Sequence, residues 1–255
     1  MSTVARSVLI SGVTGGVGRE LARLARDAGW NVVGIYHRND AEAGRLLAEL
    51  ASGPGWLQLE ACDLTDTDAV RRLLAGLRDD CGPEALVHLA APRLDVRPLH
   101  QLAWEDYERQ LVGGVKSAAG LTQGLLRRMT QRGGGRIVFA LSSVLHGNPP
   151  RGFAAYTVAK AAVAAYARCL DTEYTGRGLA VNTVSPGPMR TDLLADLPPL
   201  LVDQIVKAAP GGNWIPPLSV ARTIFWLISE APAEISGCDV PVATAPALMM
   251  ERPSP

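Results

Sequence analysis

The sequence has no excess of charge of either sign and no long apolar run. Lys plus Arg and Asp plus Glu number 25 each, so the formal net charge at pH 7 is zero. Binding to a nucleic-acid backbone relies on surplus basic side chains, and a membrane-spanning helix needs roughly 18 consecutive apolar residues. We therefore expect no nucleic-acid partner and no membrane association. Because no signal-peptide pattern precedes the first glycine-rich turn, we also expect a cytoplasmic location.

Cysteine and histidine are scarce as well. The four cysteines and four histidines are scattered along the chain, with no Cys-x-x-Cys pair and no two histidines at the spacing of metal ligands. This distribution is typical of a protein from a reducing compartment. We expect neither a disulfide framework nor a metal site.

What the sequence does contain is a repeated alternation of short and long segments. Short β-branched or apolar runs are typical of strands, and the longer segments between them have the periodicity of helices. No linker-like segment and no internal repeat divides the chain, so we predict a single domain over residues 1–255. The predicted strands are 7–10, 31–35, 56–61, 85–90, 136–141, 179–184 and 238–242, and the predicted helices are 17–28, 41–50, 66–77, 107–129, 155–174 and 219–229.

Strands that are mostly separated by helices pair in parallel through right-handed crossovers. The predicted fold is therefore α/β: a doubly wound, mainly parallel seven-stranded sheet with helices on both faces. Ligands of such a sheet bind beyond the carboxyl ends of its strands. Residues 188–217 follow one of these ends, are rich in proline, and have helical character only over 193–209. We expect them to form a substrate lid; a surface excursion is the alternative.

Three glycines, Gly12, Gly16 and Gly18, stand between the first predicted strand and the helix that follows it. Without Cβ atoms the backbone can turn tightly and approach a pyrophosphate closely. The helix N-terminus, which includes Val17, then offers its free amides and partial positive charge to the phosphates. The pattern favours dinucleotide binding over an ordinary glycine-rich turn.

The segment after the second predicted strand should meet the adenosine ribose of such a cofactor. A carboxylate there favours NAD, whereas a basic residue favours the 2′-phosphate of NADP. Arg38, with His37 beside it, comes before any carboxylate, so we expect Arg38 to bind that phosphate and NADP(H) to be favoured over NAD(H). An exposed loop arginine is the alternative. Asp63, which ends the third strand, either accepts from the adenine amino group or belongs to the cap region of the next helix.

Three further residues suggest catalysis. Ser143 follows the fifth predicted strand, Tyr156 comes thirteen residues later, and Lys160 lies four residues beyond Tyr156 in a helical segment. This spacing puts the phenol and the ammonium on one helix face. A phenol with an ordinary pKa near 10 is a poor acid–base catalyst, and a nearby ammonium lowers that pKa. We therefore expect a catalytic pair, with Ser143 holding a substrate oxygen, rather than a buried tyrosine beside an exposed lysine.

Taken together, these motifs resemble the short-chain dehydrogenase/reductase family over nearly the whole chain. Within that family the chain looks most like the branch of carrier-protein ketoreductases and alcohol dehydrogenases. The resemblance is carried by the glycine turn of residues 11–18, by Cys62-Asp63-Leu64, by Ser143, Tyr156 and Lys160, and by residues 182–187 followed by Thr191.

The resemblance implies a Rossmann sheet in which Tyr156 is the general acid for carbonyl reduction and Ser143 orients the substrate. It implies that Lys160 lowers the pKa of Tyr156 and binds the nicotinamide ribose. It also implies a homodimer or homotetramer built through two helices with small residues. The residues expected to bind the cofactor are Gly12, Gly16, Val17, Gly18, Arg38, Asp63, Leu64, Ala90, Tyr156, Lys160, Pro186, Gly187 and Thr191.

Two departures from the family pattern concern the interior of the site. The segment His88-Leu89-Ala90-Ala91 replaces the usual Asn-Asn-Ala-Gly, so His88 must make the hydrogen bonds of an asparagine. Gly114 stands where the family often has a fourth catalytic asparagine, whose main-chain carbonyl holds a water in the proton relay. A pair of glycines such as Gly113 and Gly114 can itself distort a helix and free a carbonyl. We therefore expect the relay to survive without the side chain.

Around the pocket, His146 is a candidate substrate contact, Arg93 and Arg97 are candidates to meet an anionic substrate, and Arg177 is a candidate contact for an acyl carrier. For each, an ordinary loop role is the alternative. The first functional hypothesis is an NADP(H)-dependent ketoreductase acting on a small-molecule or carrier-linked, polyketide-type or fatty-acyl-like carbonyl. The second is an NAD(P)-dependent secondary-alcohol dehydrogenase, and the third is a dinucleotide-binding protein without catalytic activity.

Overall fold

A computed structural model describes residues 6–77, 82–209 and 211–243. All seven expected strands are present and join one fully parallel sheet, in the order β3-β2-β1-β4-β5-β6-β7. The strand order reverses between β1 and β4, and in doubly wound sheets a reversal of this kind opens a crevice at the carboxyl ends. The strands are β1 (Ser7–Ser11), β2 (Asn31–Tyr36), β3 (Leu57–Ala61), β4 (Ala85–His88), β5 (Gly135–Ala140), β6 (Leu179–Pro186) and β7 (Asp239–Val242).

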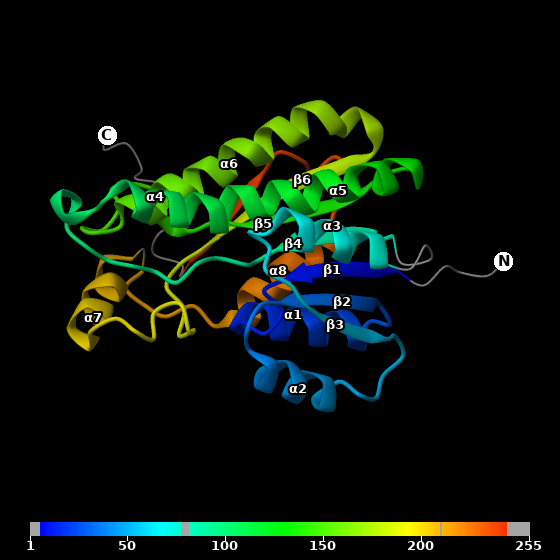
Figure 1. Cartoon of the computed structure of the whole chain (residues 1–255), viewed down its shortest axis with the longest axis horizontal. Helices are drawn as coiled ribbons and strands as arrows, with labels where there is room; N and C mark the ends of the chain where they lie inside the picture. The colour runs from blue at the N-terminus through cyan, green and yellow to red at the C-terminus, as the bar shows by residue number, and fades with distance from the viewer. Residues whose placement is uncertain (1–5, 78–81, 210, 244–255) are drawn as a thin grey trace, which may run out of the picture.

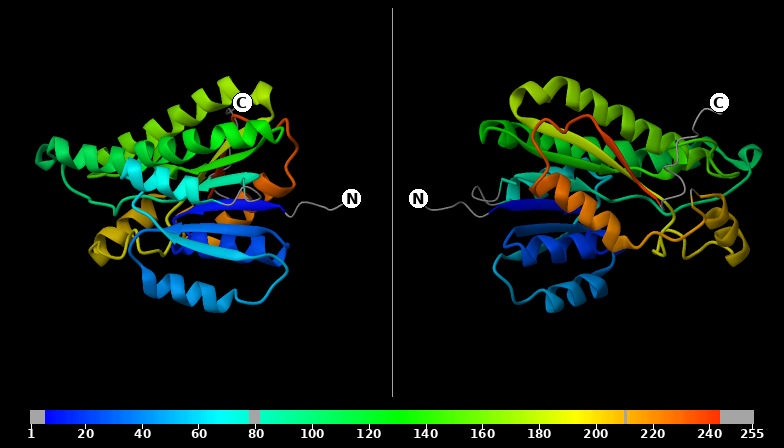
Figure 2. Two further views of the ribbon diagram at one scale, coloured as in Figure 1. Left: turned by 45° about the vertical axis from the view of Figure 1, so that its right-hand side comes forward. Right: turned by 180° about the vertical axis from the view of Figure 1, so that it is seen from behind.

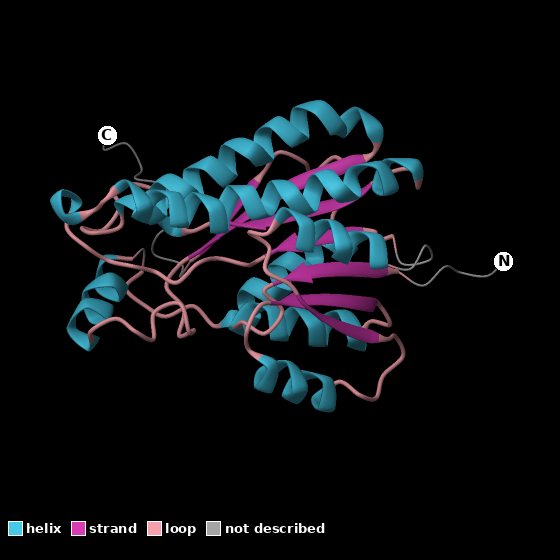
Figure 3. Cartoon of the chain, viewed as in Figure 1, coloured by secondary structure: helices cyan, strands magenta, loops and turns pink. Residues whose placement is uncertain are grey.

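Helices cover both faces of the sheet (Figures 1 and 3), which confirms the doubly wound α/β fold. One face carries α1 (Gly16–Asp27), α2 (Asp40–Glu49) and α8 (Pro217–Ser229), and the other carries α3 (Thr67–Gly76), α5 (Ser117–Gln131) and α6 (Ala154–Tyr174). Further helical segments in the described ranges are α4 (Trp104–Leu111), η3 (Val112–Lys116), α7 (Pro199–Ala208) and the short turns η2 (Leu99–Gln101), η4 (Ser143–Leu145) and η5 (Thr175–Arg177).

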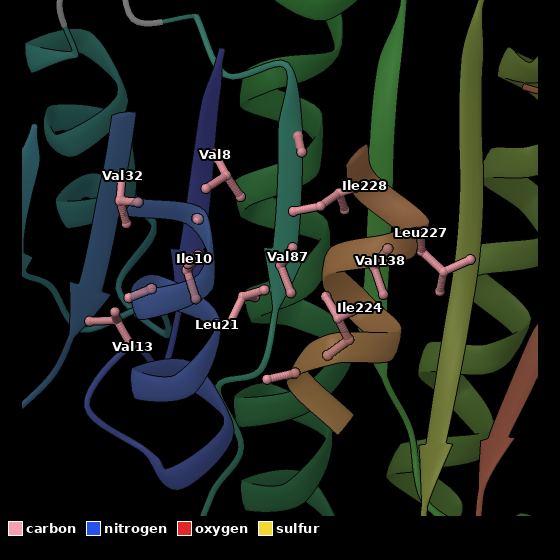
Figure 4. Close-up of a cluster of buried hydrophobic side chains, with 14 of the residues drawn as sticks. Val8, Ile10, Val13, Leu21, Val32, Val87, Val138, Ile224, Leu227 and Ile228 are labelled. Carbon is pink, nitrogen blue, oxygen red and sulfur yellow. The ribbon is translucent and has the colours of Figure 1, made fainter. Parts of the chain in front are cut away.

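The core lies between these layers. Figure 4 shows one half of it, in which Ile10 and Val87 from adjacent strands meet Leu21 of α1 and Ile224 and Ile228 of α8. Both faces of the central strands are covered, so every residue of β1 is buried, and this explains why these strands read as continuous apolar runs. The burial fixes the strand ends, and with them the positions of the loops that carry polar residues.

The helix expected over residues 107–129 is interrupted. It begins earlier, at Trp104, and a π-helical segment, η3 (Val112–Lys116), separates α4 from α5. The glycine pair at 113 and 114 lies inside this segment. Such wide turns insert an extra residue into the helical ladder and redirect its carbonyls. The expected distortion of the helix at the glycine pair is therefore present.

The segment between β6 and α8 contains α7, within the part expected to have helical character. Figure 2 shows α7 standing apart from the layers, beyond the end of the sheet toward which the strands point. None of the helices in the described ranges is long and apolar enough to cross a membrane. The same residues contain no group of three histidine, cysteine, aspartate or glutamate side chains able to hold a metal ion.

Candidate active site

A cavity of about 1160 Å³ opens at the carboxyl ends of the strands. It gathers residues from the glycine turn, from the ends of β2 to β6 and from the segment before α8. Every residue that the sequence suggested for catalysis or cofactor binding lies on its wall. These residues are Gly12, Gly16, Val17, Gly18, Arg38, Asp63, Leu64, Ala90, Ser143, Tyr156, Lys160, Pro186, Gly187 and Thr191.

The glycine turn is tight enough to need its glycines. Gly12 has a positive φ of 71°, and a Cβ atom there would lie 3.0 Å from the amide nitrogen of Ala90. A Cβ atom on Gly18 would collide with the carbonyl oxygen of Gly12. No side chain caps the start of α1, so the first amides of that helix border the cavity as donors for an anion. This cradle fits the pyrophosphate of a dinucleotide.

The far end of the cavity carries the residues expected to meet the adenosine. The Arg38 side chain contacts the ring of His37, whose Nε2 lies 3.5 Å from a carboxylate oxygen of Asp63. The Asp63 carboxylate accepts from the hydroxyl and the amide of Thr65, and these bonds hold its pKa below the usual value. Asp66 caps α3, and the bonds to Thr65 place Asp63 in the turn that leads into that helix, with its other carboxylate oxygen facing His37.

The three catalytic candidates converge on one side of the cavity. Ser143 begins η4, three residues after the end of β5, while Tyr156 and Lys160 occupy successive turns of α6. The Lys160 ammonium donates to the carbonyl of Ala140 over 2.7 Å and lies 5.8 Å from the centre of the Tyr156 ring. Tyr156 is only 7% exposed and packs edge-on against Phe153.

The electrostatics of this pair differ from the expectation. Burial raises the pKa of the Tyr156 phenol, and a hydrogen bond with Ser142 only partly opposes that effect. Burial also lowers the pKa of the Lys160 ammonium to about 8. The lowered tyrosine pKa expected from Lys160 is absent in the chain by itself, because the phenol is desolvated and the ammonium bonds to a backbone carbonyl. Ser142, which sequence reasoning passed over, is the polar side chain beside the phenol, and its hydroxyl accepts from the Val144 amide over 3.4 Å.

His88 is hydrogen-bonded through both of its ring nitrogens. Its Nδ1 atom lies 2.8 Å from the Ser11 hydroxyl, and its Nε2 atom lies 3.3 Å from the Ser117 hydroxyl. The Ser117 hydroxyl reaches the carbonyl oxygens of Gly113 and Gly114, at 2.7 and 2.9 Å. The carbonyl expected to be freed at Gly114 therefore has a partner, Ser117, which sequence reasoning missed because the contact depends on tertiary structure.

Beside Tyr156 the cavity has an apolar wall. Leu94 from the β4–α4 loop and Phe153 pack with Tyr156 and with Ile205 of α7, and Leu193 and Leu194 join them from the start of the expected lid. All of these residues line the cavity. The sequence alone did not single them out, because isolated apolar residues in loops carry no periodic signal.

The charged residues proposed around the pocket are mostly engaged with carboxylates. Arg93 pairs with Asp196 of the expected lid, and Arg97 pairs with Asp95 and Asp106. His146 lines the cavity, and its Nε2 lies 2.9 Å from Asp239 of β7. Arg177 ends η5, one residue before Gly178 leads into β6, so it lies at the amino end of that strand, and it stacks on Tyr174. Arg177 is therefore far from this cavity within one chain.

Comparisons of the sequence with known proteins agree with this geometry. Residues 12–244 match the family model described as enoyl-(acyl carrier protein) reductase. The 3-oxoacyl-[acyl-carrier-protein] reductase MabA of Mycobacterium bovis is 30% identical over 241 residues, covering 94% of this chain and 92% of the relative. The cis-4-hydroxycyclohexanecarboxylate dehydrogenase of Sinomonas cyclohexanicum is 30% identical over 234 residues, covering 91% of this chain and 92% of the relative.

Solved structures have the same fold. A short-chain type dehydrogenase/reductase from Mycobacterium ulcerans superposes with a TM-score of 0.83 at 26% identity, covering 93% of this chain and 88% of that protein. A single-residue variant of the actinorhodin polyketide ketoreductase, crystallised with NADPH, superposes with a TM-score of 0.84 at 24% identity, covering 97% of this chain and 100% of that protein.

Proposed function

Because the chain belongs to the short-chain dehydrogenase/reductase family, we propose that it is an NADP(H)-dependent ketoreductase with Tyr156 as its proton donor. The chain is an oxidoreductase that acts on hydroxyl or carbonyl groups. The observation that carries the finer proposal is the placement of Tyr156, Lys160 and Ser143 on the wall of the cavity that also contains the glycine turn.

In the proposed reaction the chain binds a ketone with its oxygen between Ser143 and Tyr156. A bound reduced nicotinamide supplies the hydride for the carbonyl carbon. Tyr156 gives its phenolic proton to the carbonyl oxygen, which yields a secondary alcohol, and the hydroxyls of Ser142 and Ser143 hold that oxygen in place. The positive charge of Lys160 stabilises the phenolate that is left behind. The apolar wall excludes water from the reacting atoms.

The protonation state of Tyr156 at neutral pH is the one that reduction needs. Because burial raises the pKa of the phenol, the phenol keeps the proton that reduction consumes, and the charge of Lys160 must offset its weaker acidity. Oxidation of an alcohol needs the phenolate instead. We therefore infer that reduction runs at neutral pH, whereas the reverse reaction gains rate as the pH rises.

The decisive experiment replaces the proton donor. Tyr156→Phe removes the phenolic hydroxyl and keeps the ring, so we expect turnover to fall by roughly a thousandfold or more, with the dissociation constant for NADPH changed less than threefold. Consumption of NADPH followed by absorbance, and cofactor fluorescence, measure the two quantities. Tyr174→Phe, at the other end of α6, is the matched control. If Tyr156→Phe kept a tenth of the turnover, Tyr156 would not be the acid.

The preference for NADP(H) rests on Arg38. A relative described as an NADPH-dependent aldehyde reductase-like protein, from Arabidopsis thaliana, is 27% identical over 253 residues. We expect Arg38→Gln to lower kcat/KM for NADPH by about 10- to 100-fold while kcat/KM for NADH stays within twofold, since only NADPH carries the 2′-phosphate. Arg45→Gln, an exposed arginine of α2 paired with Glu42, is the control. A wild-type preference for NADH by tenfold would contradict the assignment.

A secondary-alcohol dehydrogenase is the second candidate, favoured by the similarity to a hydroxycyclohexanecarboxylate dehydrogenase. The substrate also has two candidate forms, since the relative MabA acts on acyl-carrier-protein substrates, whereas the arginines at the cavity mouth are paired with carboxylates. That pairing favours a free small ketone over a phosphate-bearing carrier arm. A panel of ketones, acyl thioesters and alcohols with both nicotinamides separates these cases by the rates observed.

A further inference from the structure

The buried histidine at the end of β4 has hydrogen-bonding partners that leave it only one arrangement of protons. The Ser11 hydroxyl accepts from the amides of Leu89 and Ala90, over 3.1 and 3.2 Å. With its oxygen occupied as an acceptor, Ser11 has its own proton left to donate, and Nδ1 of His88 is the acceptor within reach at 2.8 Å. Nδ1 must therefore be the ring nitrogen without a hydrogen.

The other ring nitrogen then carries the hydrogen. His88 is 3% exposed, and burial together with the charge of Lys160 lowers its pKa to about 3, so the ring is neutral at physiological pH. The Nε2–H group donates to the Ser117 hydroxyl. That hydroxyl shares its own hydrogen between the carbonyl oxygens of Gly113 and Gly114. Every donor in this chain of bonds points the same way, from the glycine turn toward η3.

Both ends of this series of hydrogen bonds lie at positions that affect catalysis. At one end, Ser11 fixes the amides of Leu89 and Ala90, and Gly12 of the cofactor turn packs so closely there that an added Cβ atom would lie 3.0 Å from the Ala90 nitrogen. At the other end, a Cβ atom on Gly114 would lie 3.7 Å from Ala159 of the helix that carries Tyr156 and Lys160. The position of η3 therefore helps to set the distance between the catalytic helix and the glycine turn.

We propose that His88 is a positioning residue that couples the glycine turn to η3 through the chain of hydrogen bonds from Ser11 to Ser117. Its two ring nitrogens span the distance between the Ser11 and Ser117 hydroxyls. The kinetic part of this inference rests on the proposed reductase activity. The structural part concerns only the tautomer of one histidine and the binding of a dinucleotide.

The first test measures the tautomer without any catalysis. Protein labelled with ¹⁵N in its histidine rings is examined by NMR between pH 6 and pH 9, with His88→Gln used to assign the signal. We expect one ring with Nε2 protonated, Nδ1 unprotonated and no titration in that range. A ring protonated on Nδ1, or one that becomes charged near pH 6, would overturn the proposal.

The second test separates the effect of the bond from His88 to Ser11 from the effect of the bond from His88 to Ser117. His88→Asn places an amide oxygen near the Nδ1 position and keeps the bond to Ser11, so we expect the NADPH dissociation constant to stay within twofold while kcat falls at least fivefold. His88→Leu removes the hydrogen bonds to both Ser11 and Ser117. We expect kcat to fall at least tenfold and the NADPH dissociation constant to rise at least threefold. His88→Gln, whose amide lies near the Nε2 position, should show the reverse split to His88→Asn.

Ser117→Ala removes the acceptor of the Nε2–H group, and we expect it to match His88→Asn in both constants. The two changes act on one bond, so the double variant should be no slower than Ser117→Ala alone. Thr122→Val removes another buried hydroxyl of α5, which donates to the Ala118 carbonyl of its own helix and belongs to a residue that does not line the cavity, and it should leave both constants unchanged.

A purely structural role for His88 predicts a different result. In that case the variants would lower the melting temperature but leave kcat and cofactor affinity per folded molecule unaltered. If the wild-type protein reduced no carbonyl compound at all, the proposed function would fail, yet the tautomer and the NADPH affinity would still decide whether this coupling exists.

Discussion

Lys160 illustrates how one buried charge links catalysis to stability. Its pKa is lowered by burial from 10.5 to about 8 in the folded chain. Between these two values the unfolded chain binds a proton that the folded chain does not, so folding becomes more favourable as the pH rises. Keeping Lys160 protonated therefore lowers the stability of the folded chain near neutral pH, and this loss of stability declines above pH 8.

This linkage gives a prediction at the level of one residue. Lys160→Met removes the titrating group, so the stability of the wild type relative to this variant should increase from pH 7 to pH 9.5, by about 1–2 kcal/mol. Thermal unfolding of both proteins without cofactor measures the difference, which corresponds to roughly 2–6 °C. Lys207→Met, at an exposed lysine, is the control, and the stability difference between this variant and the wild type should not change over the same pH range. A Lys160→Met difference that shrinks over this range would contradict the assigned burial.

At the scale of elements, the strands were the most predictable feature. Each is a short apolar run because both faces of the sheet are covered, and that pattern is written in the local sequence. The strand expected to reach Ala90 ends at His88 instead, and the next two amides both reach the Ser11 hydroxyl, the Leu89 amide being shared with the Ser11 carbonyl. That partner lies on β1, far away in sequence, so local periodicity could not reveal it.

The features of the candidate site also fall into those with a local sequence signal and those that depend on contacts between separate elements. The glycine turn and the Tyr156–Lys160 spacing are local signals, and the sequence placed them at one cavity. The bond from His88 to Ser117, the pair of Arg93 with Asp196, and the apolar wall join separate elements. Such contacts depend on how the elements pack, which one sequence does not specify.

The segment that carries α7 makes a prediction of its own. Ile205 faces the apolar wall beside Tyr156, so each added CH₂ on a methyl ketone should raise kcat/KM by roughly fourfold until the wall is filled. Ile205→Asn should reduce that increment to less than twofold, because the amide makes the wall polar. Rates for a series of ketones measure it. Leu200→Asn, 72% exposed on the same helix, is the control, and an equal loss in both variants would argue against a lid that contacts substrate.

At the scale of the whole molecule, the outer surface of α6 exposes apolar residues that a second protomer could cover. Val158 is 46% exposed, and Ala161 and Ala165, at helical spacing from it, are exposed as well. These small apolar residues form a stripe along one helix, on the same side of the sheet as α5 (Figure 1). Side chains of this size allow two helices to approach closely, and a contiguous apolar stripe in water favours burial.

We therefore predict that the protein is a homodimer or a homotetramer at micromolar concentration, with α6 of one protomer packed against α6 of its partner. Light scattering should give a mass of two or four chains of 27.0 kDa each. Ala161→Glu combined with Ala165→Glu puts like charges across the symmetric contact, which is strongly unfavourable, so the mass should halve. Leu47→Glu, 42% exposed on α2, should leave the mass unchanged. A wild type that is monomeric would exclude the assembly, and an oligomer unaffected by the double variant would place the contact on another face.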